Sequence, residues 1–239
     1  MDFKEVILQY VDYKVILDNL PMYFDGLVLT VQLVFISLVI GLLMAVPLAV
    51  LRLSKNRWVA WPVWFYTYFF RGTPLLVQLF LIYYGMGQFI DLNASSVGAF
   101  FKDAYYCALV AFTLNTAAYT TEIIRGAMKE TPRGEIEAAK AYGMSYLQTF
   151  YRIILPSAFR RALPAYSNEV VFMLHGSAIA GVVTIMDITG VARVVYSRFY
   201  TPFEAFIFAG LLYMMLTFMI VWGFRQLEHR WLAHLRPRS

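Results

Sequence analysis

Residues 26–51 read GLVLTVQLVFISLVIGLLMAVPLAVL, and no charged side chain interrupts them. As an α-helix this run would extend about 39 Å at roughly 1.5 Å per residue. That length crosses the hydrocarbon core of a bilayer, about 30 Å thick, with some tilt. Gly41 and Pro47 within the run favour close helix packing or a bend. The stretch therefore predicts a transmembrane helix.

Four further apolar runs of comparable character follow along the chain, at residues 74–90, 104–124, 163–185 and 203–224. A spanning helix needs about 20 predominantly apolar residues, with a lower limit of roughly 17. The aromatic stretch 58–70 is too short to cross alone, and its tryptophans suit the headgroup region. We expect it to be an interfacial or tilted lead-in to the second span. The sequence thus predicts an all-α integral membrane protein with about five transmembrane helices.

The composition agrees with a membrane protein, since 60% of residues are hydrophobic and only 15% are charged, against roughly 25% in soluble domains. The single cysteine, Cys107, cannot form an internal disulfide. The first 25 residues contain five acidic side chains. They do not resemble a cleavable signal peptide, which begins with a basic region.

The distribution of basic residues predicts the orientation. With five spans, one set of segments comprises residues 52–73, 125–162 and 225–239. This set holds fifteen of the twenty Lys and Arg residues. Because cytoplasmic segments are enriched in Lys and Arg, we expect the N-terminus outside and the C-terminus in the cytoplasm. Topology therefore explains the net charge of +5, and no nucleic-acid partner is needed.

The largest charged insertion between apolar runs is the loop at residues 133–162, RGEIEAAKAYGMSYLQTFYRIILPSAFRRA. We expect a first helix from 133 to 142, capped by Thr131 and Pro132 and ended by Gly143. A second helix should run from Ser145 to about Ile154, stopped by Pro156. Small residues such as Ala138 allow another surface to approach the backbone closely. The alternative is a solvated connection between two spans.

The spacing within this loop resembles the EAA loop of permease subunits in bacterial ABC importers. The shared pattern is Glu137-Ala138-Ala139, three residues, Gly143, nine residues and then the run ending in Leu155-Pro156. In that family the loop forms coupling helices that sit in a cleft of the ATP-binding subunit. The resemblance implies a type I ABC-importer transmembrane domain. It also implies that these six residues couple the chain to ATP hydrolysis: Glu137, Ala138, Ala139, Gly143, Leu155 and Pro156.

Other segments resemble the polar amino acid subfamily of these permeases. They are FRGTPLLVQ at 70–78, NTAAYTTEI at 115–123 and AYSNEV at 165–170. Their combination is most similar to the M-type permease of histidine/lysine/arginine/ornithine or arginine/ornithine importers. The implied organisation is a periplasmic segment at 1–25, a transmembrane domain at 26–225 containing the EAA loop, and a cytoplasmic tail at 226–239.

Polar residues inside or beside the spans are candidates for the substrate pathway, because ionisable groups in hydrocarbon are costly. Carboxylates would attract a cationic amino acid, and an amide could bind its α-carboxylate. The resemblance implies that substrate-contacting side chains lie on the third span and near the end of the fourth. Structural roles are the alternative: Glu122 could pair with Arg125, and Asn115 could join two helices. The candidates are Asn115, Glu122, Glu169, Met186 and Asp187.

The sequence contains no phosphate-binding G-x-x-x-x-G-K-[ST] loop, and no Cys/His pair has metal-ligand spacing. We therefore expect no cofactor on this chain and ATP-Mg on a partner. The resemblance implies two ATP-binding subunits, a homologous second permease of the Q type, a periplasmic binding protein and residence in the bacterial inner membrane. The chain itself would not be an enzyme.

Two other functions remain open from the residues alone. A stand-alone proton- or ion-coupled carrier could use Glu122, Glu169 and His175 as a proton relay, although no inverted repeat is visible. A membrane scaffold without a pathway would not need polar groups in three stretches. The amino acid carried, and whether the second permease is identical, are not determined by the sequence.

Overall fold

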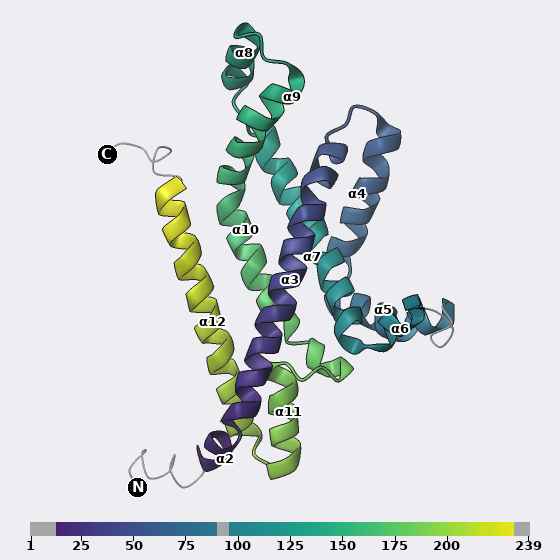
Figure 1. Ribbon diagram of the computed structural model, residues 1–239, viewed down its shortest axis with the longest axis vertical. Helices are drawn as coiled ribbons and strands as arrows, with labels where there is room; N and C mark the ends of the chain where they lie inside the picture. The colour runs from purple at the N-terminus through teal and green to yellow at the C-terminus, as the bar shows by residue number, and fades with distance from the viewer. Residues whose placement is uncertain (1–12, 90–95, 232–239) are drawn as a thin grey trace. The chain divides into compact units, whose positions relative to one another are not determined.

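The computed structural model describes residues 13–89 and 96–231, and every regular element in these ranges is a helix (Figure 1). The elements, in chain order, are α2 (Tyr13–Asp18), α3 (Leu20–Arg52), α4 (Arg57–Gly72), α5 (Leu75–Phe89), α6 (Ser96–Lys102), α7 (Ala104–Lys129), α8 (Arg133–Ala141), α9 (Tyr146–Thr149), the π-helical turn η1 (Phe150–Ile154), α10 (Leu155–Ser177), the 3₁₀ turn η2 (Ala180–Val183), α11 (Ile188–Phe199) and α12 (Pro202–Trp231).

Three of the described helices, α3, α7 and α12, are long and apolar enough to cross a bilayer. A fourth crossing arises if the helical stretch Tyr146–Val183 and the helix Ile188–Phe199 form one broken span, bent by 45°. The predicted second span corresponds to α5, whose 15 residues extend about 22 Å. Because that is shorter than the hydrocarbon core, the count of five crossings stays a prediction.

Several predicted boundaries shift. The first span begins at Leu20 rather than at residue 26, and α2 precedes it, so residues 13–25 are already mostly helical. Residues 1–12 of the predicted periplasmic segment lie outside the described residues. The aromatic lead-in is the helix α4. The last helix continues to Trp231, well into the predicted tail, whose residues 232–239 lie outside the described part.

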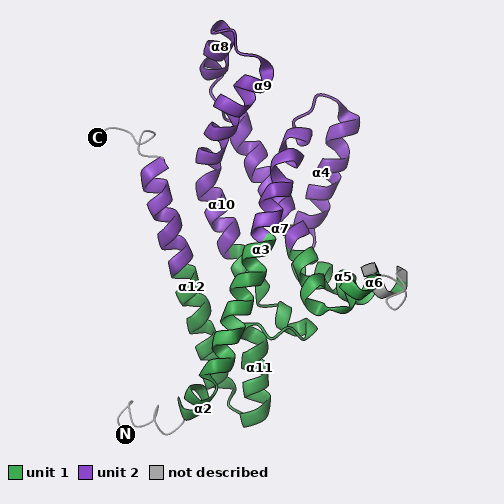
Figure 2. Cartoon of the chain, viewed as in Figure 1, with its two compact units in different colours: residues 1–37, 75–112, 172–218 green, residues 38–74, 113–171, 219–239 purple. Residues whose placement is uncertain are grey.

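The chain divides into two compact units, coloured separately in Figure 2. Unit 1 comprises Met1–Ser37, Leu75–Phe112 and Phe172–Phe218, and unit 2 comprises Leu38–Pro74, Thr113–Val171 and Met219–Ser239. Four helices (α3, α7, α10 and α12) contribute to both units. Unit 2 holds the whole of the predicted coupling loop.

Unit 2 is built on small residues where α3, α7 and α10 meet. Its buried cluster contains Ala45, Ala49, Ile124, Ala127, Met128, Ala158 and Ala162. A Cβ atom at Gly41 would lie 2.5 Å from Cγ2 of Thr116 and 3.3 Å from the backbone nitrogen of Ala117. The helices therefore approach closely at Gly41, as predicted, in the manner typical of membrane helix pairs.

Unit 1 also has a close helix contact at a glycine, between α3 and α11. A Cβ atom at Gly26 would lie 2.9 Å from Cγ2 of Val191. Nearby, the Thr30 hydroxyl accepts a hydrogen bond from the backbone N–H of Ile188 at 3.2 Å. The buried Tyr23 hydroxyl donates to the carbonyl oxygen of Ala205 at 3.0 Å, which joins α3 to α12. These contacts satisfy polar atoms that hydrocarbon would leave unpaired.

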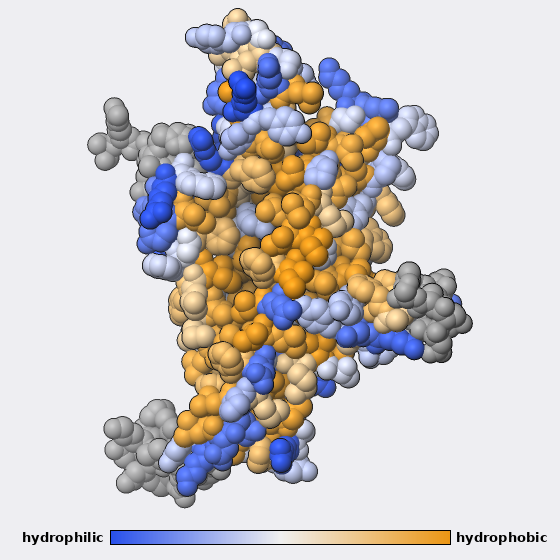
Figure 3. Space-filling view, in the orientation of Figure 1, coloured by the Kyte–Doolittle hydropathy of each residue, from blue (hydrophilic) through white to orange (hydrophobic). Residues whose placement is uncertain are grey.

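The outer surface of the long helices is largely hydrophobic in the view of Figure 3. On α12 the exposed large side chains include Leu211, Phe218, Met219 and Trp222. Only 17% of the most apolar 18-residue stretch of this helix is buried within the chain. Apolar surface on this scale marks a membrane or protein interaction site. In unit 2, hydrophilic residues gather over α8 (Figure 3).

Candidate functional site

The first helix of the predicted coupling loop, α8, ends as the sequence predicts. Gly143 adopts a left-handed φ of +74°, its N–H donates to the Lys140 carbonyl at 2.9 Å, and the Met144 N–H donates to the Ala139 carbonyl at 3.0 Å. This is the typical glycine-terminated helix end. The predicted start is wrong in detail: Pro132 occupies the N-cap position without a side-chain cap, and the buried Thr131 hydroxyl has no partner among the described residues.

The second helix of the predicted coupling loop, α9, begins at a reciprocal capping box. The Ser145 hydroxyl accepts from the Gln148 N–H, and the Gln148 side chain accepts from the Ser145 N–H. The prediction that this helix stops before Pro156 is wrong. The chain passes through the π-helical turn η1 directly into α10. A wider turn accommodates proline because its ring otherwise clashes with the carbonyl four residues earlier.

The coupling loop exposes an unusual set of side chains for a charged connection. Glu137, Ala138 and Gly143 are exposed, whereas Ala139 is buried. Large apolar or aromatic side chains also face outward, namely Tyr142, Tyr146, Leu147 and Tyr151, the first of them 87% exposed. A solvated linker does not need this apolar surface, so the loop is suited to contact another protein.

An ion pair links α8 to α10. The Arg161 guanidinium lies 3.7 Å from the Glu135 carboxylate of α8 and donates to the Ser157 hydroxyl at 2.9 Å. Leu155 and Pro156 are half-buried at the start of α10. This ion pair joins the first helix of the loop to α10, the helix that continues toward the spans.

Glu122 lies at the centre of a charged cluster in unit 2. Its carboxylate accepts from Arg125 Nε at 2.6 Å, lies 3.4 Å from Arg52 Nε, and accepts from the Thr67 hydroxyl at 3.1 Å. The predicted pairing with Arg125 is thus confirmed. The cluster ties the end of α3 and the middle of α4 to α7. A role for Glu122 in substrate binding stays a prediction.

Asn115 joins α7 to the carboxyl end of α4. Its side-chain amide donates to the Phe70 carbonyl at 3.3 Å, and the Tyr119 hydroxyl donates to the Arg71 carbonyl at the same distance. The last four carbonyls of a helix have no intrahelical partner, so α7 supplies donors for two of them. The segments 70–78 and 115–123, which resemble segments of polar amino acid permeases, therefore contact each other where α4 ends against α7.

Glu169 is buried in unit 2, where its carboxylate accepts a hydrogen bond from Thr116 at 2.9 Å. This contact joins α10 to α7. His175, the other member of the proton-relay alternative, lies within 3.0 Å of the Thr217 hydroxyl in unit 1. A histidine held in this way fits helix packing as well as proton transfer.

Asp187 and Met186 belong to unit 1. Asp187 is completely buried and caps α11, accepting from the Gly190 N–H at 2.7 Å and from the Tyr213 hydroxyl at 3.2 Å. Met186 is 41% exposed and lines a hollow of about 620 Å³ with Arg193, Tyr196 and Phe206. Of these two candidates, Met186 is the one whose side chain faces open space.

Sequence reasoning missed the polar partners of these candidates. Thr67, Thr116 and Tyr213 each bond to a candidate carboxylate. A signal existed in the threonines of α7, at positions 113, 116, 120 and 121, because hydroxyl groups at three- and four-residue spacing mark one buried helix face. Within the described residues, no three His, Cys, Asp or Glu side chains converge as metal ligands would.

Comparison with known proteins gives consistent matches over most of the chain. The family described as "Binding-protein-dependent transport system inner membrane component" matches residues 37–232. The histidine/lysine/arginine/ornithine transport system permease protein HisM of Escherichia coli (strain K12) is 46% identical over 217 residues, which are 90% of this chain and 91% of that protein. The octopine transport system permease protein OccM of Rhizobium radiobacter is 46% identical over 204 residues, 85% and 83% of the two chains.

A solved structure agrees at the level of the fold. The crystal structure of an amino acid ABC transporter with histidines superposes with a TM-score of 0.82 at 32% identity, covering 92% of this chain and 99% of that one.

Proposed function

We propose that this chain, which belongs to the binding-protein-dependent transport system inner membrane components, carries basic amino acids into the cell. It is an M-type polar amino acid permease of an ABC importer, with the type I transmembrane fold. The stand-alone carrier is therefore set aside. The substrates we propose are histidine, lysine, arginine and ornithine.

The substrate class is supported by the HisM relatives, one of which is 46% identical over 98% of this chain. An octopine permease is equally identical over a shorter range, so octopine is the second candidate. For a cationic substrate, carboxylates near the pathway would supply the attraction. The proposed pathway residues are Asn115, Glu122, Glu169, Met186 and Asp187.

Coupling to ATP is the step that the geometry supports best. The observation that carries it is the coupling loop, which exposes Tyr142, Tyr146 and Leu147 beside Glu137 and Ala138. We propose that these helices dock on an ATP-binding subunit. That subunit would bind ATP-Mg and hydrolyse it, whereas this chain would carry no cofactor. Closure of two such subunits would move α8 and α9, and α10 would pass the motion to the pathway.

The assembly we propose contains two ATP-binding subunits, a homologous Q-type permease and a periplasmic binding protein in the bacterial inner membrane. A second permease is expected because so few spans do not enclose a pathway alone. The binding protein would supply high-affinity capture of the amino acid outside the membrane.

Uptake by the complete importer in proteoliposomes tests this function. Labelled arginine should enter only with external binding protein and internal ATP, and unlabelled ornithine, lysine and histidine should compete. If octopine competes strongly and the four amino acids do not, the substrate proposal is wrong. Uptake without ATP would contradict the whole assignment.

Gly143→Asp tests the coupling loop within the same assay. A side chain at φ +74° is strained, by about 1–3 kcal/mol, and a carboxylate there would meet the docking partner. We expect uptake below roughly a tenth of wild type, with normal membrane insertion. Gly143→Asn is the matched control, because asparagine has nearly the same size as aspartate, carries no charge and tolerates a left-handed backbone. Normal uptake by Gly143→Asp would remove the coupling role.

A further inference from the structure

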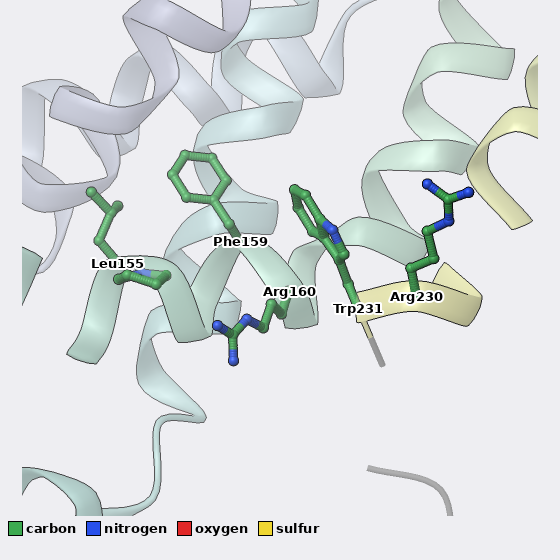
Figure 4. A pocket seen from close by; sticks show the side chains of 6 residues that line it. Leu155, Phe159, Arg160, Arg230 and Trp231 are labelled. Atoms are coloured by element: carbon green, nitrogen blue, oxygen red, sulfur yellow. The ribbon is translucent and has the colours of Figure 1, made fainter. Parts of the chain in front are cut away.

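A hollow of about 620 Å³ lies in unit 2 between the start of α10 and the end of α12. It is lined by Leu155, Pro156, Phe159, Arg160, Arg230 and Trp231. The Tyr166 and Phe224 rings, 6.2 Å apart, hold the two helices together further along. In the view of Figure 4 the Trp231 indole lies between the Phe159 ring and the Arg230 side chain. The hollow therefore combines an apolar lining with two cations.

Arg160 and Arg230 give this hollow its positive charge. Arg160 and Arg230 are both exposed, and neither has an ion-pair or hydrogen-bond partner within residues 13–89 and 96–231. A second hollow shares Pro156 and Arg160 and adds Arg152 and Arg161, with Glu135 as its one acidic residue. These exposed guanidinium groups favour an anionic occupant.

The position along the helices indicates where the hollow lies in the membrane. Arg160 precedes the apolar part of α10, and Arg230 follows the apolar part of α12, which ends at Phe224. Trp231 is half exposed beside them, as is typical of tryptophan at the headgroup level. Apolar surface continues along α12 through Trp222 and Met219, where acyl chains can pack.

We propose that this hollow binds the phosphate headgroup of an anionic phospholipid, with Arg160 and Arg230 as the phosphate ligands. Guanidinium groups pair with phosphate through two parallel hydrogen bonds. Phe159 and Trp231 contact the glycerol backbone and the first acyl carbons. A soluble anion would gain nothing from this lining, whereas basic pockets between membrane helices suit anionic lipids.

Lipid binding to the purified full chain tests the site. Native mass spectrometry in a non-ionic detergent would compare dioleoyl phosphatidylglycerol with dioleoyl phosphatidylcholine, which have the same acyl chains. We expect a preference for phosphatidylglycerol in wild type. Arg160→Gln with Arg230→Gln should weaken its binding about 30-fold, since each basic side chain near an anionic headgroup contributes roughly a fivefold gain.

Two variants separate the site from general charge effects. Arg160→Lys with Arg230→Lys should retain much of the preference, because the charge stays while the paired hydrogen bonds are lost. Arg57→Gln with Arg198→Gln removes the same charge at two exposed arginines that line neither hollow and should behave as wild type. Equal losses in this control pair, or no loss in the Gln pair, would overturn the proposal.

Two further measurements distinguish other occupants of the hollow. If millimolar inorganic phosphate displaces the lipid completely, the hollow is a simple anion site and the lipid proposal is wrong. If the chain binds phosphatidylglycerol alone but loses it on assembly with its ATP-binding subunit, the hollow is a subunit contact, which also overturns the proposal.

Discussion

At the scale of single residues, Glu122 illustrates how one carboxylate can serve structure or transport. Two arginines and a threonine from three helices converge on it. Glu122→Gln would leave Arg52 and Arg125 partly buried without a counter-charge. We expect a loss of about 2 kcal/mol in stability, less than for a fully buried pair. The thermal midpoint of the chain in detergent should fall by roughly 5 °C.

The same variant separates the two roles of Glu122. A structural role lowers the midpoint and leaves KM for the amino acid unchanged at temperatures where the protein is folded. A substrate role raises KM and leaves the midpoint in place. Glu130→Gln is the control for charge loss, because Glu130 is exposed and has no ion pair among the described residues.

Asp187 shows where prediction from the sequence reached its limit. The cost of a carboxylate beside a span marks it as a residue with a role, but not which role. In the structure both oxygens are occupied, one by the cap of α11 and the other by Tyr213. The partner Tyr213 is 26 residues away, and no local pattern predicts such a pairing. Candidate residues could thus be found by chemistry, whereas their partners required the packing.

At the scale of helices, Gly41 controls the distance between α3 and α7. Gly41→Ala would place a methyl group against Thr116 and the Ala117 backbone. Overpacking of this kind costs typically 1–3 kcal/mol, so we expect a lower thermal midpoint in detergent. Gly223→Ala on α12 is the matched control, since nothing lies within 4 Å of its Cβ position. It should be neutral or stabilising by up to about 1 kcal/mol.

The π-helical turn η1 sets how the coupling helices face α10. Deleting Arg152 would convert this turn into ordinary α-helix, rotating α9 by about 100° against α10. We expect the variant to insert normally and to lose ATP-driven uptake. Arg152→Ala is the matched control, because it removes the same side chain at constant chain length and should transport. Equal uptake by the two variants would show that the rotation has no part in coupling.

The element boundaries divide into those the sequence predicts and those it does not. Long apolar runs predicted α3 and α12 because a membrane helix must be apolar along most of its length, and Gly143 predicted the end of α8. The continuation through Pro156 was missed, since the proline rule assumes an α-helix before it and the π turn changes that context. The aromatic stretch at 58–70 was recognised from its composition, but the sequence did not predict that it forms the complete helix α4.

At the scale of the whole molecule, family and fold followed from motif spacing, while orientation rests on charge alone. The EAA pattern and the segments at 70–78 and 115–123 identified an M-type permease, which the relatives confirm. Those motifs are read from short segments and need no long-range contacts. The excess of Lys and Arg in one set of segments instead predicts how the chain is oriented in a membrane.

Cysteine labelling checks that orientation with two tyrosines of similar exposure, Tyr142 at 87% and Tyr200 at 84%. In a Cys107→Ser background, Tyr200→Cys should react with a membrane-impermeant maleimide in intact cells. Tyr142→Cys should react only after the cells are opened and denatured with SDS, which also uncovers any subunit interface. Because the positive-inside bias is three to one, the reverse pattern would mean that charge does not set the topology here. It would also place the coupling loop where no ATP-binding subunit can reach it.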